Sequence, residues 1–293
     1  MSKRKIRFIL NPFSGPRNKI DVVSLINSQI NSEFIDAEII FTSYPKHASE
    51  LSKEAADLNY FAVVAVGGDG TINEVASVLR DTNTALGIIP FGSGNGFSYH
   101  LGIRRNIVKS IDLINQCNKI CIDTAMMNDN FFINVAGLGL DAKVAFLTKK
   151  NHKRGFLPYF IQTLKESSGF KFMKMEIKSP SSEWTGEYAM AAIANGSMYG
   201  YDFSIAPKAK MNDALFDIVL VKKAPIFKYF LLAIRMIFKT LDRSSIVEYF
   251  NCTELCIRTS DADFYHVDGE GHESNTLEYK FKIYPSSLYL LTQ

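Results

Sequence analysis

The feature that most constrains the fold of this chain is a continuous apolar run that ends directly in a glycine turn. Residues 61–66 read Phe-Ala-Val-Val-Ala-Val, residues 67–70 read Gly-Gly-Asp-Gly, and an amphipathic helical pattern opens at Thr71. A strand that is apolar at every position is typical of a central parallel strand covered on both faces. The segment therefore predicts a strand, a tight turn and a helix in succession.

The same alternation of apolar runs and amphipathic stretches extends over residues 1–122. Strands that alternate with helices indicate a doubly wound parallel sheet with helices on both faces, so we expect an α/β domain here. The expected strands are 6–10, 37–41, 61–66 and 86–89, and the expected helices are 20–30, 47–58, 71–79 and 107–116.

From Asp123 onward, strand-like runs separated by turn-rich segments predict a second, mainly antiparallel β domain. Hydrophobic residues make up 47% of the chain, which is sufficient for two cores. No flexible linker marks the boundary, so we expect the two domains to pack across a cleft. The expected strands are 131–135, 172–177, 184–193, 215–221 and 252–258, and the expected helices are 141–148, 157–166 and 226–241.

The segment 226–241 is the most apolar part of the chain, but Lys228, Arg235 and Lys239 interrupt it. It is shorter than the roughly 20 apolar residues that a membrane-spanning helix needs. Two interpretations remain open: an amphipathic helix that packs on a sheet, or one whose basic flanks suit an anionic lipid surface. The basic run 149–154 has similar alternatives, a solvated helix end or a lipid contact.

Charge, cysteine and histidine patterns exclude several classes of protein. Lys and Arg number 33 against 30 Asp and Glu, so the chain has no global field of the kind that marks nucleic-acid binders. The four cysteines lack the Cys-x-x-Cys spacing of zinc knuckles, and the histidines form no i,i+4 ligand pair. The N-terminus leads into a short strand rather than a secretory apolar segment, so we expect a cytoplasmic protein.

The glycine turn at 67–70 has the features of a phosphate cradle. A helix N-terminus presents backbone N–H groups and a favourable dipole to anions, and glycine lets phosphate oxygens approach the backbone. Asp69 is a carboxylate in this position, which is compatible with phosphates when Mg²⁺ lies between them. A tight strand-to-helix turn without a ligand is the alternative.

Two further polar loops follow predicted strands: residues 11–15, Asn-Pro-Phe-Ser-Gly, and residues 92–96, Gly-Ser-Gly-Asn-Gly. Taken alone, the second loop lacks the Gly-x-Gly-x-x-Gly spacing of a dinucleotide site. Because the carboxyl ends of parallel strands meet at one edge of a sheet, we expect all three loops to converge there, where open α/β sheets bind ligands.

In this order, the motifs at 11–15, 67–75 and 89–95 resemble those of the diacylglycerol kinase catalytic family, which includes bacterial lipid kinases and sphingosine and ceramide kinases. The resemblance covers nearly the whole chain. Its later motifs fall at Asp123, 132–141, 206–213 and 267–270.

The resemblance implies a lipid kinase that transfers the γ-phosphate of ATP to a lipid hydroxyl. Its α/β nucleotide domain would span 1–122 and be completed by the segment 280–293, and its β-sandwich lipid-substrate domain would span 123–279. Asp268 would be the general base. The implied nucleotide-binding residues are Asn11, Ser14, Gly15, Thr42, Gly67, Gly68, Asp69, Gly70, Thr71, Asn73, Ser93 and Glu270.

Elementary chemistry is consistent with the role of Asp268. Phosphoryl transfer needs positioning, charge neutralisation and a carboxylate that can accept the hydroxyl proton. Gly269 frees the backbone to turn at this point, and Glu270 could orient the carboxylate or bind metal. The alternative is an Asp-Gly turn between two strands with exposed acidic side chains.

The resemblance also implies a structural Mg²⁺ site, formed by Asp213 with the backbone carbonyls of Lys210 and Leu215. Oxygen ligands of this kind suit a hard cation. Family members usually have Gly after this Asp, whereas this chain has Ala214. If the turn needs φ > 0, Ala would be strained by about 1 kcal/mol or more and metal binding would be weakened.

A second departure concerns Gly96, which stands where many diacylglycerol kinases have Asp. A carboxylate that could join a Mg²⁺–water network is therefore missing, and Asp69 and Asp123 remain as candidate members. A small residue at this position is closer to the sphingoid and ceramide branch. The sequence leaves the identity of the lipid open.

Two rival functions remain. An NAD kinase or phosphofructokinase-like enzyme would share the glycine turn, although the motifs at 11–15 and 268–270 favour the lipid branch. A non-catalytic lipid or nucleotide sensor of the same fold is the other. The expected partners are ATP, Mg²⁺ and a lipid at the inner membrane surface, with a homodimer as a further option and no nucleic acid.

Overall fold

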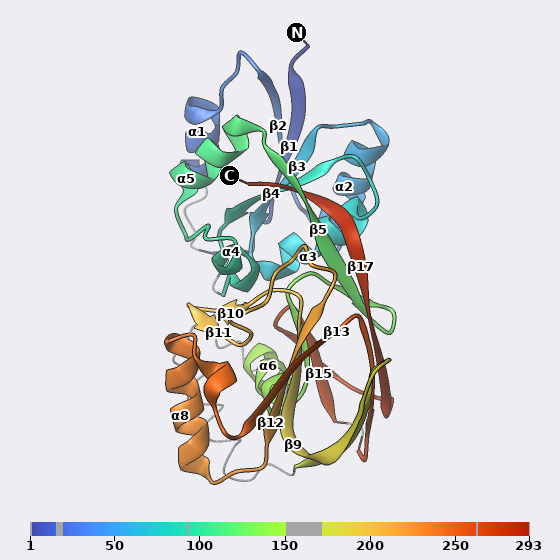
Figure 1. Cartoon of the computed structure of the whole chain (residues 1–293). Helices are drawn as coiled ribbons and strands as arrows, with labels where there is room; N and C mark the ends of the chain where they lie inside the picture. The colour runs from blue at the N-terminus through green and yellow to red at the C-terminus, as the bar shows by residue number, and fades with distance from the viewer. Residues whose placement is uncertain (1, 16–19, 93, 151–171, 262, 293) are drawn as a thin grey trace. The chain divides into compact units, whose positions relative to one another are not determined.

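The computed structural model describes residues 2–15, 20–92, 94–150, 172–261 and 263–292, and the chain divides into two units (Figure 1). Unit 1 comprises Met1–Ile122 and Ser286–Gln293, and unit 2 comprises Asp123–Pro285. The returning segment joins unit 1 at 286, whereas the family resemblance implied a start at about 280.

A parallel sheet forms the centre of unit 1. Its order is β2-β1-β3-β4, and the last residues of β17 pair in parallel with β4. Every residue of β3 is buried, in agreement with the continuous apolar run. The bounds are β1 (Arg4–Leu10), β2 (Ile35–Phe41), β3 (Ala62–Gly67), β4 (Ala85–Pro90) and β17 (Glu278–Leu291).

Helices cover both faces of this sheet. The neighbours α1 and α5 lie on one face, and the neighbours α2 and α3 lie on the other (Figure 1). The core under α1 and α5 includes Val22, Ile26, Ile111 and Ile114 with Phe8 and Val64 of the sheet. The α/β prediction is therefore confirmed. The bounds are α1 (Ile20–Gln29), α2 (His47–Asp57), α3 (Asp69–Leu79), α4 (Gly96–His100) and α5 (Ile107–Gln116).

Unit 2 is the expected antiparallel β-sandwich. Its strands pair in the order β16-β15-β7-β9-β8-β14-β17, and β12 pairs with both β9 and β13. The bounds are β5 (Lys119–Met127), β6 (Asn130–Phe132), β7 (Val135–Gly139), β8 (Met173–Lys178), β9 (Glu183–Ala194), β10 (Met198–Gly200), β11 (Phe203–Ser204), β12 (Phe216–Lys222), β13 (Val247–Cys252), β14 (Glu254–Thr259), β15 (Phe264–Val267) and β16 (Glu270–Glu273).

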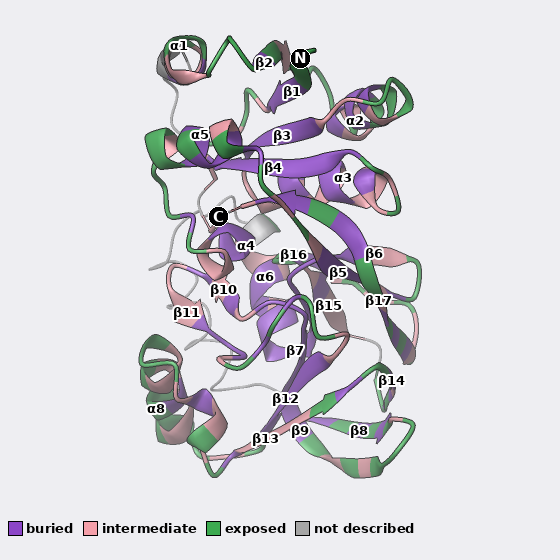
Figure 2. Cartoon of the chain, turned by 45° about the horizontal axis from the view of Figure 1, so that its top comes forward, coloured by how far each residue is buried: buried purple, intermediate pink, exposed green. Residues whose placement is uncertain are grey.

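The core of unit 2 is formed by the buried side chains of its strands, and β7 is buried along its whole length (Figure 2). Phe132, Phe216, Tyr279 and Phe281 are its largest fully buried side chains. The helical elements of this unit are α6 (Leu140–Lys150), α8 (Ile226–Ile237) and the short 3-10 helix η1 (Leu241–Arg243). Among the described residues, no helix has the length and apolar character to cross a membrane.

One expected strand, 252–258, is interrupted. The chain pairs with β12 up to Cys252, and from Glu254 it pairs with β8 and β17 instead. The burial alternation shifts by one residue at Thr253 and Glu254, which are both exposed. The helix expected over 157–166 and residues 151–154 of the basic run lie outside the described residues.

Candidate active site

Three loops meet at the carboxyl edge of the sheet in unit 1. They follow β1, β3 and β4, as the sequence predicted. A Cβ atom built on Gly92 would lie 2.4 Å from the Cα of Gly68, and one built on Gly68 would lie 3.2 Å from the Cα of Gly92. The two glycine loops are therefore in direct backbone contact, and Gly92 has no room for a side chain.

Asn11 ties the first loop to the glycine turn. Its Nδ2 donates to Oγ1 of Thr71 at 3.0 Å, and its carbonyl accepts the hydroxyl of Ser14 at 2.9 Å. Gly15 has φ +66°, and a Cβ atom there would lie 2.0 Å from the carbonyl oxygen of Phe91. The first loop is thus packed against both glycine loops, which brings together Asn11, Ser14, Gly15 and Thr71.

The N-terminus of α3 faces this junction. Gly68 is its N-cap residue, and the N–H of Ile72 donates to the Gly68 carbonyl at 3.0 Å. The first turn of a helix leaves backbone N–H groups without intrahelical partners, and the helix dipole favours an anion there. Glycines 67, 68 and 70 keep this turn narrow, so its chemistry fits the phosphates of a nucleotide.

Asp69 is the first residue of α3. Its Oδ1 accepts the N–H of Phe97, in the first turn of α4, at 3.4 Å. A carboxylate that stands beside a phosphate-binding turn is suited to share a Mg²⁺ ion with the phosphates. The residues present therefore fit the expected metal as well as the nucleotide.

Asn95, at φ +54°, closes the second glycine loop. Its Oδ1 accepts the N–H of Gly92 at 3.0 Å, and its Nδ2 donates to the Gly92 carbonyl at 2.9 Å. Arg105 Nη2 donates to the same carbonyl at 2.5 Å. Sequence reasoning missed Arg105, because no motif marks it. In α4, burial lowers the pKa of His100 to about 4, so this imidazole is neutral at neutral pH.

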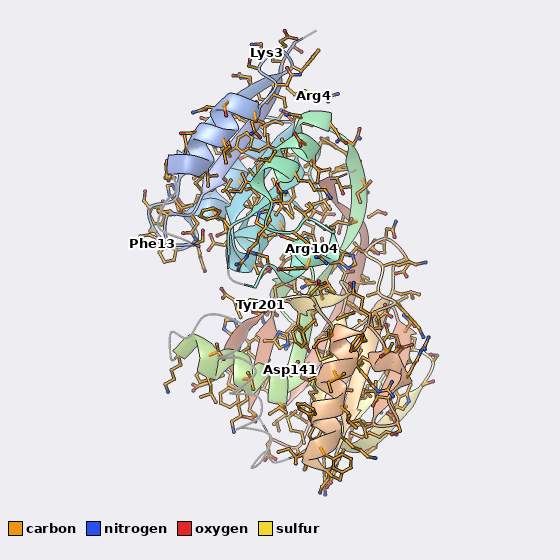
Figure 3. The ribbon with its side chains drawn as sticks, turned by 90° about the vertical axis from the view of Figure 1, so that its left-hand side faces the viewer. Lys3, Arg4, Phe13, Arg104, Asp141 and Tyr201 are labelled. Carbon is orange, nitrogen blue, oxygen red and sulfur yellow. The ribbon has the colours of Figure 1, made fainter. Side chains whose placement is uncertain are left out.

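Thr42 and Asn73 are two further predicted nucleotide contacts in unit 1. Thr42 follows β2, is buried, and donates its N–H to the Leu10 carbonyl at 2.9 Å. Asn73 lies one turn into α3. Ser93 lies outside the described residues. Figure 3 shows Phe13, the tip of the first loop, at the surface of unit 1, where it is 75% exposed.

In unit 2, the carboxylate of Asp268 is held by backbone N–H groups. Its Oδ1 accepts from Asn134 at 2.9 Å and from Val135 at 3.2 Å, and its Oδ2 accepts from Ile133 at 3.1 Å. Three such donors stabilise the negative charge. Asp268 is 9% exposed, so the carboxylate is fixed just below the surface.

The Asp268-Gly269 pair forms the turn between β15 and β16. Both residues have positive φ, +47° and +82°, and Val267 pairs with Glu270 across the turn. This is the geometry of a type I′ hairpin, for which Asp-Gly is a favoured sequence. The hairpin-turn interpretation is therefore right about the backbone. Its expectation of exposed acids is wrong for Asp268 and right for Glu270, which is exposed at the start of β16.

A buried polar cluster lies two residues before this turn. His266 Nε2 is 3.0 Å from Asp141 Oδ2, and the hydroxyl of Tyr199 donates to the same oxygen at 2.6 Å. Figure 3 marks Asp141, whose bond to His266 joins the first turn of α6 to β15. Sequence reasoning missed this cluster. Its only signal was that Asp141 ends the motif at 132–141.

The turn at residues 210–215 carries the predicted structural metal ligands. Asp213 Oδ1 accepts the N–H of Leu215 at 3.2 Å, and Ala214 has φ +61°. Asp123 is buried against the same turn, since its Oδ2 accepts the N–H of Ala214 at 2.8 Å. Asp123 thus belongs to unit 2, whereas Asp69 belongs to unit 1. The carbonyl of Lys210 is the third predicted ligand of this turn.

Within the described ranges, no three His, Cys, Asp or Glu side chains gather into a metal-binding group. A cation at the 210–215 turn would therefore depend on backbone carbonyls and water as well as on Asp213. The family resemblance implied the same ligands, and metal binding at this turn stays a prediction.

Comparison with known proteins gives two family matches. Residues 5–127 match the family described as the diacylglycerol kinase catalytic domain. Residues 134–292, more than half of the chain, match the family described as the YegS C-terminal NAD kinase beta sandwich-like domain.

Individual relatives agree with these matches. The chain is 26% identical over 272 residues to the diacylglycerol kinase of Bacillus subtilis (strain 168), which covers 91% of this chain and 90% of the relative. It is 34% identical over 191 residues to the "Probable lipid kinase YegS-like" of Klebsiella pneumoniae (strain 342), 64% of each chain. The crystal structure of a diacylglycerol kinase from Bacillus anthracis str. Sterne shares the fold, with a TM-score of 0.81, 21% identity, and coverage of 100% of this chain and 98% of that one.

Proposed function

Since the chain belongs to the family that joins a diacylglycerol kinase catalytic domain to a YegS-type C-terminal domain, we propose that it transfers the γ-phosphate of ATP to a lipid hydroxyl. In this proposal unit 1 binds the phosphates of ATP, and unit 2 supplies the residue that receives the hydroxyl proton. The names of the relatives, lipid kinase and diacylglycerol kinase, support a lipid as the acceptor.

The observation that carries the proposal is the backbone contact between Gly68 and Gly92. It brings two glycine loops together at the N-terminus of α3, where narrow loops and a helix dipole favour phosphate. Asn11 fixes the third loop to the same place through Thr71. A turn that served only to connect a strand to a helix would not need three loops packed on one another.

Each residue of this junction has a role in the proposal. Backbone N–H groups of residues 68–71 bind phosphate oxygens, and Arg105 adds positive charge beside the second loop. Asp69 would hold Mg²⁺, which would supply positive charge to neutralise the phosphates. Asn11 and Asn95 keep the loops in place, so that binding ATP requires little rearrangement.

The proposal assigns the proton-accepting role to Asp268. As the lipid hydroxyl oxygen bonds to the γ-phosphorus, its proton passes to the Asp268 carboxylate and the bond between phosphorus and the ADP oxygen breaks. The N–H groups of residues 133–135 hold the carboxylate in a fixed position. Glu270, which follows the turn, would orient the acceptor or a metal.

Incubation of the purified protein with ATP, Mg²⁺ and a panel of detergent-dispersed lipids tests the function. The panel contains diacylglycerol, monoacylglycerol, phosphatidylglycerol, ceramide and a sphingoid base, and mass spectrometry identifies the products. We expect one class of lipid to gain a phosphate. The absence of any phosphorylated lipid, with NADP formed from NAD instead, would overturn the proposal and favour the NAD kinase alternative. The description of the C-terminal family, which names an NAD kinase-like sandwich, is the reason to include NAD in the test.

Substitution Asp268→Asn tests the base. We expect the rate of lipid phosphorylation to fall by a factor of about 100 or more, while binding of ATP to unit 1 is retained. The matched control is Asp129→Asn, at an exposed acid of the same unit, which should leave the rate unchanged. Thermal unfolding of both variants checks that the hairpin is intact. Undiminished phosphorylation by a folded Asp268→Asn protein would exclude this residue as the base.

A lipid acceptor resides in a bilayer, so we propose that the protein works at the cytoplasmic surface of the membrane as a peripheral enzyme. Binding of ATP or lipid without any turnover would instead support the rival sensor function. The panel experiment separates the two, since a sensor forms no phosphorylated product.

A further inference from the structure

Helix α8 is held to unit 2 by one narrow side. Leu232 is 6% exposed, and Tyr229 and Met236 pack against the same buried cluster. These three residues recur at helical spacing i, i+3 and i+7, so they form one stripe along the helix. The Tyr229 hydroxyl also accepts the N–H of Ala224 at 2.9 Å, which fixes the start of the helix.

The large apolar side chains outside this stripe are exposed. They form a second stripe at spacings of three, four and seven residues, on the far side of the helix from Leu232. Figure 2 shows the exposed residues along α8. Each is between 37% and 72% exposed, and they are Ile226, Phe227, Phe230, Leu231, Ile234, Ile237 and Phe238. Contiguous apolar surface of this kind is uncommon on a protein that functions alone in water and marks an interaction site.

The charged residues of α8 itself are all positive. Lys228 and Arg235 are seven positions apart, which places them along one flank of the helix, and Lys239 follows the end of the helix. Lys222 and Lys223 precede the helix and pair with Glu248 and Glu187 at 2.6 and 3.2 Å. No residue between 222 and 240 is acidic. An apolar face flanked by basic residues of the same helix is the pattern of a helix that lies in the headgroup region of an anionic bilayer.

We propose that α8 is the membrane-docking element of this protein, and that its exposed face inserts into the surface of an anionic phospholipid bilayer. This deepens the proposed function and rests on it in one respect, because an enzyme with a bilayer-resident acceptor must dwell at the bilayer. The aromatic and aliphatic side chains enter the acyl boundary, and the basic flank contacts lipid phosphates.

A second copy of the chain is the competing occupant. A two-fold interface would pair this patch with itself and so bring the basic flank of one copy toward that of the other. An anionic bilayer complements the same charges. The charge pattern therefore favours lipid over self-association.

Co-sedimentation with vesicles tests the inference without ATP. The full chain is mixed with vesicles of phosphatidylglycerol and phosphatidylcholine, and separately with vesicles of phosphatidylcholine alone. We expect binding to the mixed vesicles that weakens when salt is added. The double variant Phe230→Gln/Ile234→Gln should lower the bound-to-free ratio at least about tenfold, since each change removes an apolar group from the lipid.

Matched controls test whether the effects are specific to α8 or follow from the loss of any exposed apolar or basic side chain. Phe34→Gln/Leu58→Gln removes two apolar side chains of similar exposure from unit 1 and should leave vesicle binding unchanged. Lys228→Gln/Lys239→Gln should reduce binding to the mixed vesicles more than to phosphatidylcholine vesicles. Lys53→Gln/Lys109→Gln, at exposed lysines of unit 1, should not.

The possible outcomes are distinguishable. Equal binding by the wild-type chain and Phe230→Gln/Ile234→Gln would overturn the inference, and so would a wild-type dimer that this variant converts to a monomer in sedimentation without any vesicle binding. Phosphorylation of a detergent-dispersed lipid should survive in all α8 variants, because no bilayer is involved. Vesicle binding through α8 in a protein that phosphorylates no lipid would sustain the inference and remove the proposed function.

Discussion

At the scale of single residues, three turns of unit 2 contain residues other than glycine in the left-handed backbone conformation. Ala214 has φ +61°, so the strain that the sequence predicted for a left-handed turn is present. Tyr201 and Asp202, at φ +52° and +67°, form the two-residue turn between β10 and β11 in the same way. Asp268 also has positive φ, and in this conformation its carboxylate accepts hydrogen bonds from the N–H groups of residues 133–135.

Ala214→Gly should therefore stabilise unit 2. Glycine adopts φ +61° without the steric cost that alanine incurs, and the larger entropy of the unfolded glycine offsets part of the gain. We expect the free energy of unfolding to rise by about 1 kcal/mol, as measured by denaturant unfolding. In the variant, added Mg²⁺ should raise the unfolding midpoint further than it does in the wild type if the 210–215 turn binds metal.

The matched control is Ala56→Gly, in the second half of α2. Glycine in a helix costs about 1 kcal/mol relative to alanine, so this change should destabilise by a similar amount. Destabilisation by both substitutions would mean that the strain at Ala214 is compensated by contacts of its methyl group.

At the scale of elements, the sequence predicted the strands that alternate with helices and the three loops at their ends. It did so because a buried parallel strand and a glycine-rich turn each need particular residues. It missed the pairing of the Asp141 and His266 side chains, which lie 125 positions apart. No local pattern records a contact that depends on how β7, β15 and α6 pack. Arg105 was missed for the same reason.

Gly92→Ala tests the junction of the loops that follow β3 and β4. The new Cβ would lie 2.4 Å from the Cα of Gly68 and 2.8 Å from Oδ1 of Asn95, so the loops must separate. We expect the KM for ATP to rise by about tenfold or more, equivalent to a loss of roughly 1.4 kcal/mol of binding.

Gly102→Ala is the control for this change. Gly102 also has positive φ, +69°, but a Cβ there meets nothing within 4 Å. The control should lower stability by about 1 kcal/mol through backbone strain while leaving the KM for ATP unchanged. An equal rise in KM for both variants would show that backbone strain, rather than loop contact, governs nucleotide binding.

At the scale of the whole molecule, two strands connect the units. β5 begins in unit 1 and ends in unit 2, and β17 begins in unit 2 and ends in unit 1, where Leu290 pairs with Leu86 of β4. The α/β unit is thus completed by the last residues of the chain. Composition and periodicity do not indicate such a return, since the final strand reads like any other, and only the family resemblance predicted it.

Leu290→Ala should destabilise unit 1 although the residue lies at the end of the chain. Leu290 is fully buried, and removal of a buried leucine side chain costs about 2–5 kcal/mol. The neighbouring Tyr289 is 37% exposed, so Tyr289→Ala should cost much less. Denaturant unfolding of both variants measures the difference, and similar values would mean that the terminal strand contributes little to the core.

The way in which Asp268 is held determines which substitutions can detect its hydrogen-bond donors. The groups that hold the carboxylate belong to the main chain of residues 133–135, so replacing any of those three side chains leaves the donors in place. An alanine scan of these positions would report the loss of buried side chains, since Ile133, Asn134 and Val135 are all buried, and it would leave the anchor itself in place. Only a change that removes an amide hydrogen, such as proline or a backbone ester, would test the anchor.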